Sequence, residues 1–269
     1  MLKQRIITAI ILIAATLAVL FYLSPQSFCI VIGVIALAAA WEWTNLMEIK
    51  SASWRLLYLV VMFLVFLNAL FIPMTLIFVT TFIWWLFAII LITLYPRGSR
   101  WWGKGFVWRG LMGLIVLMPC WAAVNYIRNQ NQGIYALIFL FVLVWGADST
   151  AYFVGKKWGK NKLASIVSPG KSIEGVIGAV VFAIVITLLA LWSSHVSFRG
   201  WPWAILLSVV TVLFSVVGDL FESMLKRQAN LKDSSQLLPG HGGILDRIDS
   251  LTAAAPIFAF GALLLGMYL

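Results

Sequence analysis

Long apolar segments follow one another along nearly the whole chain, and short polar stretches rich in Gly, Pro, Lys or Arg separate them. A helix needs about 20 apolar residues to cross about 30 Å of hydrocarbon. Nine segments meet this requirement, with ends placed to within a few residues. The predicted spans are residues 6–23, 28–46, 56–72, 75–95, 107–127, 134–152, 174–193, 203–226 and 250–268.

These segments are continuously apolar and do not alternate, which favours helices over the strands of a membrane barrel. In hydrocarbon each backbone N–H and C=O group must bond within its own segment, and a helix achieves this. We therefore predict an all-α, polytopic fold in one integrated membrane domain. Its N-terminal part, residues 1–133, holds about five spans, and its C-terminal part, residues 134–269, holds about four spans with loops at 153–173 and 227–249.

Basic residues set the expected orientation of the spans. With the N-terminus inside, 17 of the 19 Lys and Arg residues fall in inner loops, and only Arg128 and Arg199 fall outside. An excess of positive charge is typical of cytoplasmic loops. We therefore predict a cytoplasmic N-terminus and, after nine spans, a C-terminus outside.

Composition agrees with a membrane protein, because 63% of the residues are hydrophobic and only 10% are charged. The net charge of +10 suits a surface that faces anionic lipid headgroups, and it would also attract anionic substrates. We expect no nucleic-acid partner at a membrane surface. Cys29 and Cys120 lie in apolar segments without paired or metal-ligand spacing, so we interpret them as small buried residues.

Acidic residues gather in the C-terminal part of the chain. Of nine, only Glu42 and Glu48 precede position 148. Six of the others are predicted to lie at helix ends on the cytoplasmic side: Asp148, Glu174, Asp219, Glu222, Asp246 and Asp249. Charged groups at the membrane are costly unless they face a polar cavity and find partners, so this gathering predicts a functional site. For Glu174 and Glu222 the alternative is that they only complement helix N-termini or extend to the headgroups.

One face of the helix predicted at 203–226 carries a mixed polar set. Asp219, Glu222, Ser223 and Lys226 are spaced i, i+3, i+4 and i+7 and so share one side of a helix. Such a set could hold a hard cation against phosphate oxygens. Mg²⁺ is usually bound by one or two carboxylates together with substrate phosphates and water.

A glycine-rich loop, Pro239–Gly243, precedes the last span. Its glycines allow the backbone to approach a ligand and to present N–H groups to an anion. Asp246 and Asp249 follow, three residues apart at a helix start, and could face one ion together. His241 either contacts the substrate or serves as a structural hydrogen-bonding group, and the sequence leaves both roles open.

Lysine and glycine are also frequent between the spans at 134–152 and 174–193. The sequence Gly170-Lys171-Ser172 suggests a P-loop, but that motif needs a glycine where Ser165 stands and a preceding strand, which a membrane helix cannot supply. We reject the P-loop. We expect simpler electrostatics, in which lysines and a helix N-terminus attract phosphate.

Residues 223–249 resemble the motif of the phosphatidate cytidylyltransferases, also called CDP-diacylglycerol synthases. The sequence reads Ser223-x-Leu-Lys226-Arg227-x4-Lys232-Asp233-x-Ser235-x2-Leu238-Pro239-x-His241-Gly242-Gly243-Ile-x-Asp246-Arg247-Ile-Asp249. All motif positions are filled. The segments Asp148–Tyr152 and Ser168–Gly175 are similar to other stretches of the family, except that Ser172 and Ile173 replace a threonine and an aromatic residue. The resemblance covers 148–250 well and the first five spans only by hydropathy.

The resemblance implies an enzyme of the bacterial inner membrane that joins CTP to phosphatidic acid at a cytoplasmic site, forming CDP-diacylglycerol and pyrophosphate for phospholipid synthesis. It also implies a homodimer, Mg²⁺ held by carboxylates including Asp219 and Asp246, and a second, monovalent cation such as K⁺. We add Asp249 as a metal ligand. The predicted catalytic residues are Asp219, Lys226, Arg227, Asp246, Arg247 and Asp249. The predicted substrate-binding residues are Asp148, Ser168, Lys171, Ser172, Ser223, Lys232, His241, Gly242 and Gly243.

Other classes of membrane protein share parts of this pattern. A transporter or channel would place its ionisable groups near the bilayer midplane, whereas these cluster at one face. A dolichol-kinase-like enzyme would share membrane helices and metal chemistry. The long motif at 223–249 argues against both, and the sequence pattern of CDP-alcohol phosphotransferases is absent.

Overall fold

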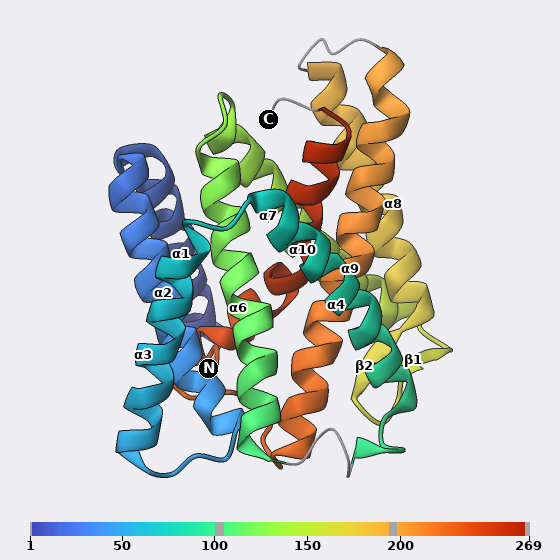
Figure 1. Ribbon diagram of the computed structural model, residues 1–269. Coiled ribbons are helices and arrows are strands. Elements are labelled where there is room, and N and C mark those ends of the chain that lie inside the picture. Colours follow the sequence, from blue (N-terminus) through green and yellow to red (C-terminus); the bar gives the residue numbers. More distant parts are fainter. Residues whose placement is uncertain (1, 100–104, 194–197, 267–269) are drawn as a thin grey trace.

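The computed structural model describes residues 2–99, 105–193 and 198–266, with the backbone alone for residues 2–6. Long helices pack side by side in one bundle, in which α1 begins in the lower half and α10 ends near the top (Figure 1). The helices are α1 (Leu2–Tyr22), α2 (Pro25–Leu46), α3 (Ala52–Ala69), α4 (Met74–Leu94), α6 (Phe106–Arg128), α7 (Gly133–Trp158), α8 (Ile173–Ser193), α9 (Trp201–Gln228) and α10 (Leu245–Leu264), with a short 3₁₀ helix at Phe198–Gly200.

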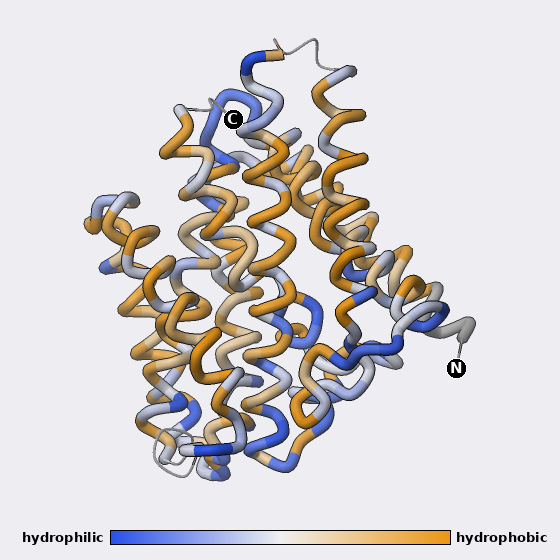
Figure 2. The backbone as a smooth tube through the Cα atoms, turned by 90° about the vertical axis from the view of Figure 1, so that its right-hand side faces the viewer, coloured by the Kyte–Doolittle hydropathy of each residue, from blue (hydrophilic) through white to orange (hydrophobic). Residues whose placement is uncertain are grey.

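Each predicted span coincides with one of these helices, so the all-α, polytopic fold is confirmed. Eight of the described helices are long and apolar enough to cross a membrane, and the side chains described for α1 add a shorter apolar stretch, Ile7–Tyr22. Hydrophobic residues cover the lengths of the helices, and hydrophilic ones collect toward their ends (Figure 2). The chain is therefore a multi-pass membrane protein, and its predicted orientation stays a prediction.

The polar connections differ from the expected loops. Helix α7 continues to Trp158, because Lys156 and Lys157 in its last turn suit the negative end of the helix dipole. Beyond it a two-stranded antiparallel hairpin forms from β1 (Lys162–Ala164) and β2 (Ser168–Ser172). A strand does precede α8, contrary to our expectation. Residues 170–172 lie inside that strand and not in a loop after it, so they do not form a P-loop.

Small residues bring α9 and α10 into close contact. Ala253, Ala254 and Ala255 of α10 are fully buried. Gly218 of α9 lies against α10, where an added Cβ would come within 2.6 Å of the backbone oxygen of Asp249. Helices in membranes depend on such small residues for close backbone approach. This contact brings the polar end of α9 beside the start of α10.

Candidate active site

Four elements bring predicted site residues to one end of the bundle. Asp148 comes from α7, Lys171 from β2, Asp219 from α9 and Asp249 from the second turn of α10. Helices α7 and α10 are joined directly, because Ser250 Oγ donates to Asp148 Oδ2 at 2.9 Å. The Asp148 carboxylate is close enough to feel the charges of Lys171 and Asp219. Residues from 148 to 249 therefore meet in one place, as the motif resemblance implies.

The hairpin delivers its lysine to α9. Lys171 Nζ lies 2.6 Å from Asp219 Oδ2, and both side chains are about a quarter exposed, at 23% and 25%. The neighbouring Ser172 is buried, and its hydroxyl accepts a hydrogen bond from Gly175 N at the start of α8. Ser172 therefore fixes the end of the strand that carries Lys171. Direct contact of Ser172 with substrate stays a prediction.

The predicted polar face of α9 is confirmed by its contacts. Ser223 Oγ donates to Asp219 Oδ1 at 3.1 Å, one turn away. The buried Lys226 lies 3.0 Å from Glu222 Oε1 and 2.7 Å from Asp246 Oδ1. Lys226 thus joins two carboxylates inside the protein and ties α9 to the start of α10.

Asp246 is the anchor of the glycine-rich loop. Its Oδ2 accepts hydrogen bonds from Ser234 N, Ser234 Oγ and Gly243 N, at 2.8 to 2.9 Å. Gly242 has a φ of +83°, and a Cβ there would come within 2.8 Å of Asp246 Oδ2. Glycine is therefore required at 242 both for its backbone and for room. Protein donors thus contact both oxygens of Asp246. The metal-ligand role that we predicted for Asp246 stays a prediction.

Glu42 is a site residue that we did not predict. It lies on α2 with a side chain only 1% exposed, and it contacts the segment before α10. A lone carboxylate inside an apolar span is costly and usually functional, so this signal could have singled it out. We gave it no role because it stands far from the motif in the sequence.

The remaining predicted residues surround this centre. His241 is half-buried, and Ser168 is half-buried at the start of β2. The Nδ1 atom of His241 is buried with no hydrogen-bond partner among the described residues. Three predicted cationic residues are exposed: Arg227, Lys232 and Arg247. Arg227 donates to the backbone oxygens of residues 167 and 231, at 3.4 and 3.3 Å, so it steadies the turn of the hairpin.

Carboxylates outnumber cationic side chains at this end of the molecule. Five carboxylates interact electrostatically with two lysines and with the exposed Arg247: Asp148, Asp219, Glu222, Asp246 and Asp249, against Lys171 and Lys226. In the described ranges, no group of three or more His, Cys, Asp or Glu side chains could enclose a metal by itself. The donors fit a divalent cation that completes its coordination with water and substrate phosphates.

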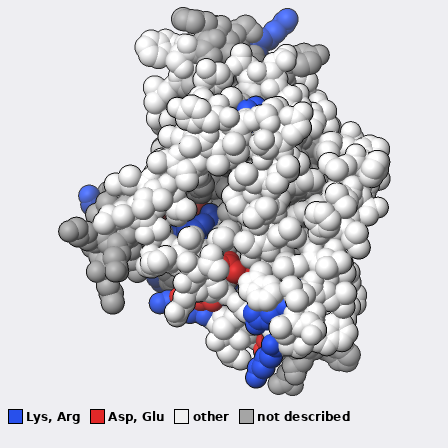
Figure 3. Space-filling model, turned by 90° about the vertical axis from the view of Figure 1, so that its left-hand side faces the viewer, with Lys and Arg blue, Asp and Glu red and all other residues white. Residues whose placement is uncertain are grey.

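A cavity of about 660 Å³ opens beside three of these carboxylates. Its polar end includes Asp148, His241, Asp246, Arg247 and Asp249. Its walls are apolar residues of α1, α2, α6, α7 and α10, among them Leu12, Ile32, Leu117, Trp121 and Trp145. The face on the side of α1 to α3 is hollowed, with acidic and basic side chains visible among otherwise uncharged surface (Figure 3). The cavity therefore combines a charged end with a long apolar wall.

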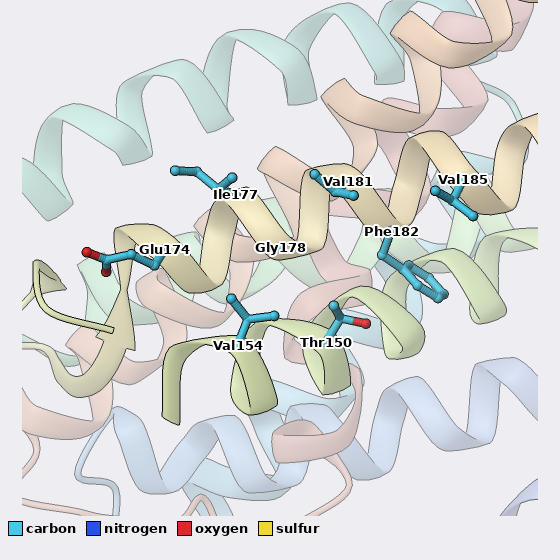
Figure 4. Close-up of a pocket in the computed structure, with 8 residues that line it drawn as sticks. All are labelled: Thr150, Val154, Glu174, Ile177, Gly178, Val181, Phe182 and Val185. Carbon is cyan, nitrogen blue, oxygen red and sulfur yellow. The ribbon is translucent and has the colours of Figure 1, made fainter. Parts of the chain in front are cut away.

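A second hollow lies on the outside of α7 and α8 (Figure 4). Its volume is about 510 Å³, and its lining is almost wholly apolar, including Val154, Ile177, Val181 and Val185. Glu174 stands at one end, where it accepts hydrogen bonds from Asn161, the residue before β1. The lining offers no cluster of groups for chemistry, so the active-site assignment rests on the first cavity.

Comparison with known proteins gives matches over nearly the whole chain. A sequence model of the Cytidylyltransferase family matches residues 3–265. The phosphatidate cytidylyltransferase of Haemophilus influenzae is 41% identical over 284 residues, covering 97% of this chain and 98% of the relative. The Pseudomonas aeruginosa enzyme of the same name is 42% identical over 262 residues, covering 96% of each chain. That of Brucella abortus is 35% identical over 265 residues, covering 97% of this chain and 94% of the relative.

Proposed function

Since this chain belongs to the cytidylyltransferase family and is therefore a CTP-dependent nucleotidyltransferase, we propose that it joins CTP to phosphatidic acid. The products are CDP-diacylglycerol and pyrophosphate. The observation that carries the choice of lipid is the cavity beside α1, with charged groups at one end and apolar walls beyond them. A lipid with a phosphate headgroup has the same division between charge and hydrocarbon.

In the proposed reaction a phosphate oxygen of phosphatidate attacks the α-phosphorus of CTP. A new P–O bond forms, the bond from the α-phosphorus to the bridging oxygen of the β-phosphate breaks, and pyrophosphate leaves. The nucleophile is already ionised, so little general-base work is needed. Rate enhancement then depends on alignment and on stabilising the developing charge.

The cationic side chains divide between binding and positioning. Lys171 is half-buried and pairs with a single carboxylate, so it can neutralise phosphate oxygens. Arg247 is exposed at the charged end of the cavity and can do the same. Lys226 is buried between Glu222 and Asp246, so in this proposal it fixes those carboxylates and does not touch phosphate.

Mg²⁺ is part of this proposal. Asp219 and Asp249, with Asp148 beside them, would hold the ion. When bound, it would polarise the phosphate oxygens of CTP and offset the charge that develops on the leaving pyrophosphate. A monovalent cation such as K⁺ stays a prediction.

Purified protein given CTP labelled at the α-phosphate tests the reaction directly. Label should pass to the lipid only when phosphatidate and Mg²⁺ are both present, and a γ-label should leave as pyrophosphate. A dolichol-kinase-like enzyme would instead transfer the γ-label and release CDP. Transfer of the γ-label, or no dependence on phosphatidate, would refute the proposal.

The apolar wall supplies a test of the lipid site. Thr16 of α1 lines the cavity, whereas the neighbouring Leu17 is 41% exposed and is not part of the lining. Thr16→Trp should raise the KM for long-chain phosphatidate about three- to tenfold, since a bulky side chain in the space of the lipid costs about 1 kcal/mol or more of binding free energy. The KM for CTP should stay the same, and Leu17→Trp should resemble the wild type. An equal rise for both substrates would place the lipid elsewhere.

The cytoplasmic location of the site and the homodimer also belong to this proposal. The exposed Gln236 lies in the loop before α10. Gln236→Cys in a chain without Cys29 and Cys120 should react with a membrane-impermeant thiol reagent only after cells are permeabilised. Reaction in intact cells would show that the predicted orientation is wrong.

Light scattering of the detergent-solubilised protein should give the mass of two chains, and a single-chain mass would refute the dimer.

A further inference from the structure

Helix α2 holds the loop of the active site through one carboxylate. Glu42 Oε1 accepts hydrogen bonds from Ser235 Oγ at 2.6 Å and from Ile244 N at 3.0 Å. Glu42 Oε2 accepts from Leu245 N at 2.7 Å and lies 3.2 Å from Ser234 Oγ, whose one proton it shares with Asp246. Four donors from both ends of the segment 234–245 therefore converge on one side chain that lies about 200 residues earlier in the chain.

Hydrogen-bond donors, and no cation, balance this carboxylate in the part of the chain that the structure describes. The side chain of Glu42 is buried and forms no ion pair with the described residues. Two of its donors are the N–H groups at the start of α10, where the helix dipole favours negative charge. A buried carboxylate is tolerated only when such bonds replace its hydration. The geometry of Glu42 is thus closely matched to this loop.

Two further observations tie the same helix to the same loop. Asn45 Nδ2, one turn along α2, donates to the backbone oxygen of Ser234 at 2.8 Å. A Cβ at Gly243 would collide with the carboxylate of Glu42 and with the hydroxyl of Ser234. Gly243 is therefore glycine so that the loop can close on Glu42.

We propose that Glu42 is a positioning residue for cytidylyl transfer, which holds the loop 234–245 in the shape that the active site uses. Ser234 links it to the site, because the same hydroxyl that contacts Glu42 also contacts Asp246 Oδ2 at 2.9 Å. Asp246 is followed by Arg247 and Asp249, which line the charged end of the cavity. The inference rests on the proposed function and adds the N-terminal part of the chain to its machinery.

Glu42→Gln tests the inference, with Glu48→Gln as its matched control. The amide keeps the size of the side chain but turns an N–H₂ group toward N–H and O–H donors. Because displacement of catalytic groups by about 1 Å can cost about 10²-fold, we expect kcat to fall ten- to hundredfold with little change in KM. Glu48 is 56% exposed near the end of the same helix and contacts Arg109 instead, so its variant should keep wild-type kinetics.

A double-mutant cycle distinguishes positioning from a general loss of structure. The Ser235 hydroxyl contacts Glu42 and the backbone N of Leu237. Ser235→Ala should lower kcat several-fold in the wild type and add little in the Glu42→Gln background, because the two changes break one contact. Additive effects, or wild-type kinetics in Glu42→Gln, would overturn the inference.

A readout that needs no activity separates this inference from the proposed function. A thiol reagent should label Gln236→Cys faster in the Glu42→Gln background, since the loop has lost its anchor. Equal labelling rates would overturn the inference even if the wild type makes CDP-diacylglycerol. Faster labelling in a protein that makes none would sustain the anchoring of the loop by Glu42 and refute only the proposed function.

Discussion

Two groups of carboxylates at the same end of the bundle differ in the number of hydrogen-bonding contacts that the protein makes with them. Glu42 and Asp246 each have four or more hydrogen-bonding contacts with the loop, the start of α10 or Lys226, and they share the one proton of the Ser234 hydroxyl. Asp148, Asp219 and Asp249 each accept one or two from the described residues. We call the first pair the anchoring group and the other three the open group.

The difference shows that residue type alone does not fix the role of a carboxylate in this site. Donors of the anchoring group are mostly backbone N–H groups and serine hydroxyls whose positions the fold sets. The open group keeps lone pairs for a ligand, and its strongest partner, Lys171, is a flexible side chain that can move to phosphate. The anchoring group should therefore build the site, and the open group should bind and react.

The largest expected effect is the loss of turnover in Asp219→Asn. The change keeps the size of the side chain but removes a charge that would hold Mg²⁺, so kcat should fall on the order of 10²-fold or more. Asp249→Asn should do the same, and the double variant should lose little more, because residues that act as one unit are not additive. If either single variant turns over CTP normally, its carboxylate does not belong to the open group.

Asp246→Asn should lower stability as well as turnover. The variant leaves Lys226 and the donors of Ser234 and Gly243 facing a neutral amide, and breaking a buried ion pair costs about 3 kcal/mol or more. Its free energy of unfolding in detergent should fall by about that amount, whereas that of Asp219→Asn should change by about 1 kcal/mol or less. Asp246→Asn with wild-type stability and lost turnover would move Asp246 into the open group.

The helices and the polar face of α9 could be predicted because both depend on local spacing. Apolar length reports a membrane span directly, and an i, i+4 pair such as Asp219 and Ser223 is fixed by helix geometry. The hairpin could not be predicted, since strands of three and five residues between lysines leave no periodic pattern. Arg109 shows the same limit, because we counted it as a loop charge and it is buried against Glu48 at 2.8 Å.

The division of the carboxylates could not be predicted either. The contacts of Glu42 with the loop join residues that lie 192 to 203 positions apart. No local pattern encodes such a separation, and the motif includes only the loop side of it. The spacing of Asp246 and Asp249 predicts one shared ion, and this stays a prediction; the spacing gave no sign that Lys226 and Ser234 also contact Asp246.

Lys171→Gln tests the open group through the cationic partner of Asp219. Loss of the ammonium should raise the KM for CTP or phosphatidate, or lower kcat, by about tenfold, because a charge-assisted bond to phosphate is lost. Lys162→Gln in the facing strand changes an exposed lysine of the same hairpin and should leave the kinetics unchanged. If both variants behave alike, Lys171 contributes only to the general surface charge.

The smallest change in structure is the removal of one serine hydroxyl that contacts each group of carboxylates. Ser250 Oγ contacts the open group at Asp148, which lines the cavity and can take a water molecule instead. Ser250→Ala should therefore lower the free energy of unfolding by about 1 kcal/mol or less, and kcat only a few-fold.

Ser234→Ala removes a buried hydroxyl that contacts both anchoring carboxylates. Hydrogen bonds to charged groups contribute about 1.5 to 3 kcal/mol, so this variant should lose that much stability. Denaturant unfolding of the two purified variants in one detergent measures the difference. Because both serines are buried and both changes delete a single oxygen, burial alone predicts equal losses. Equal losses would show that the two groups do not differ in how firmly the protein holds them.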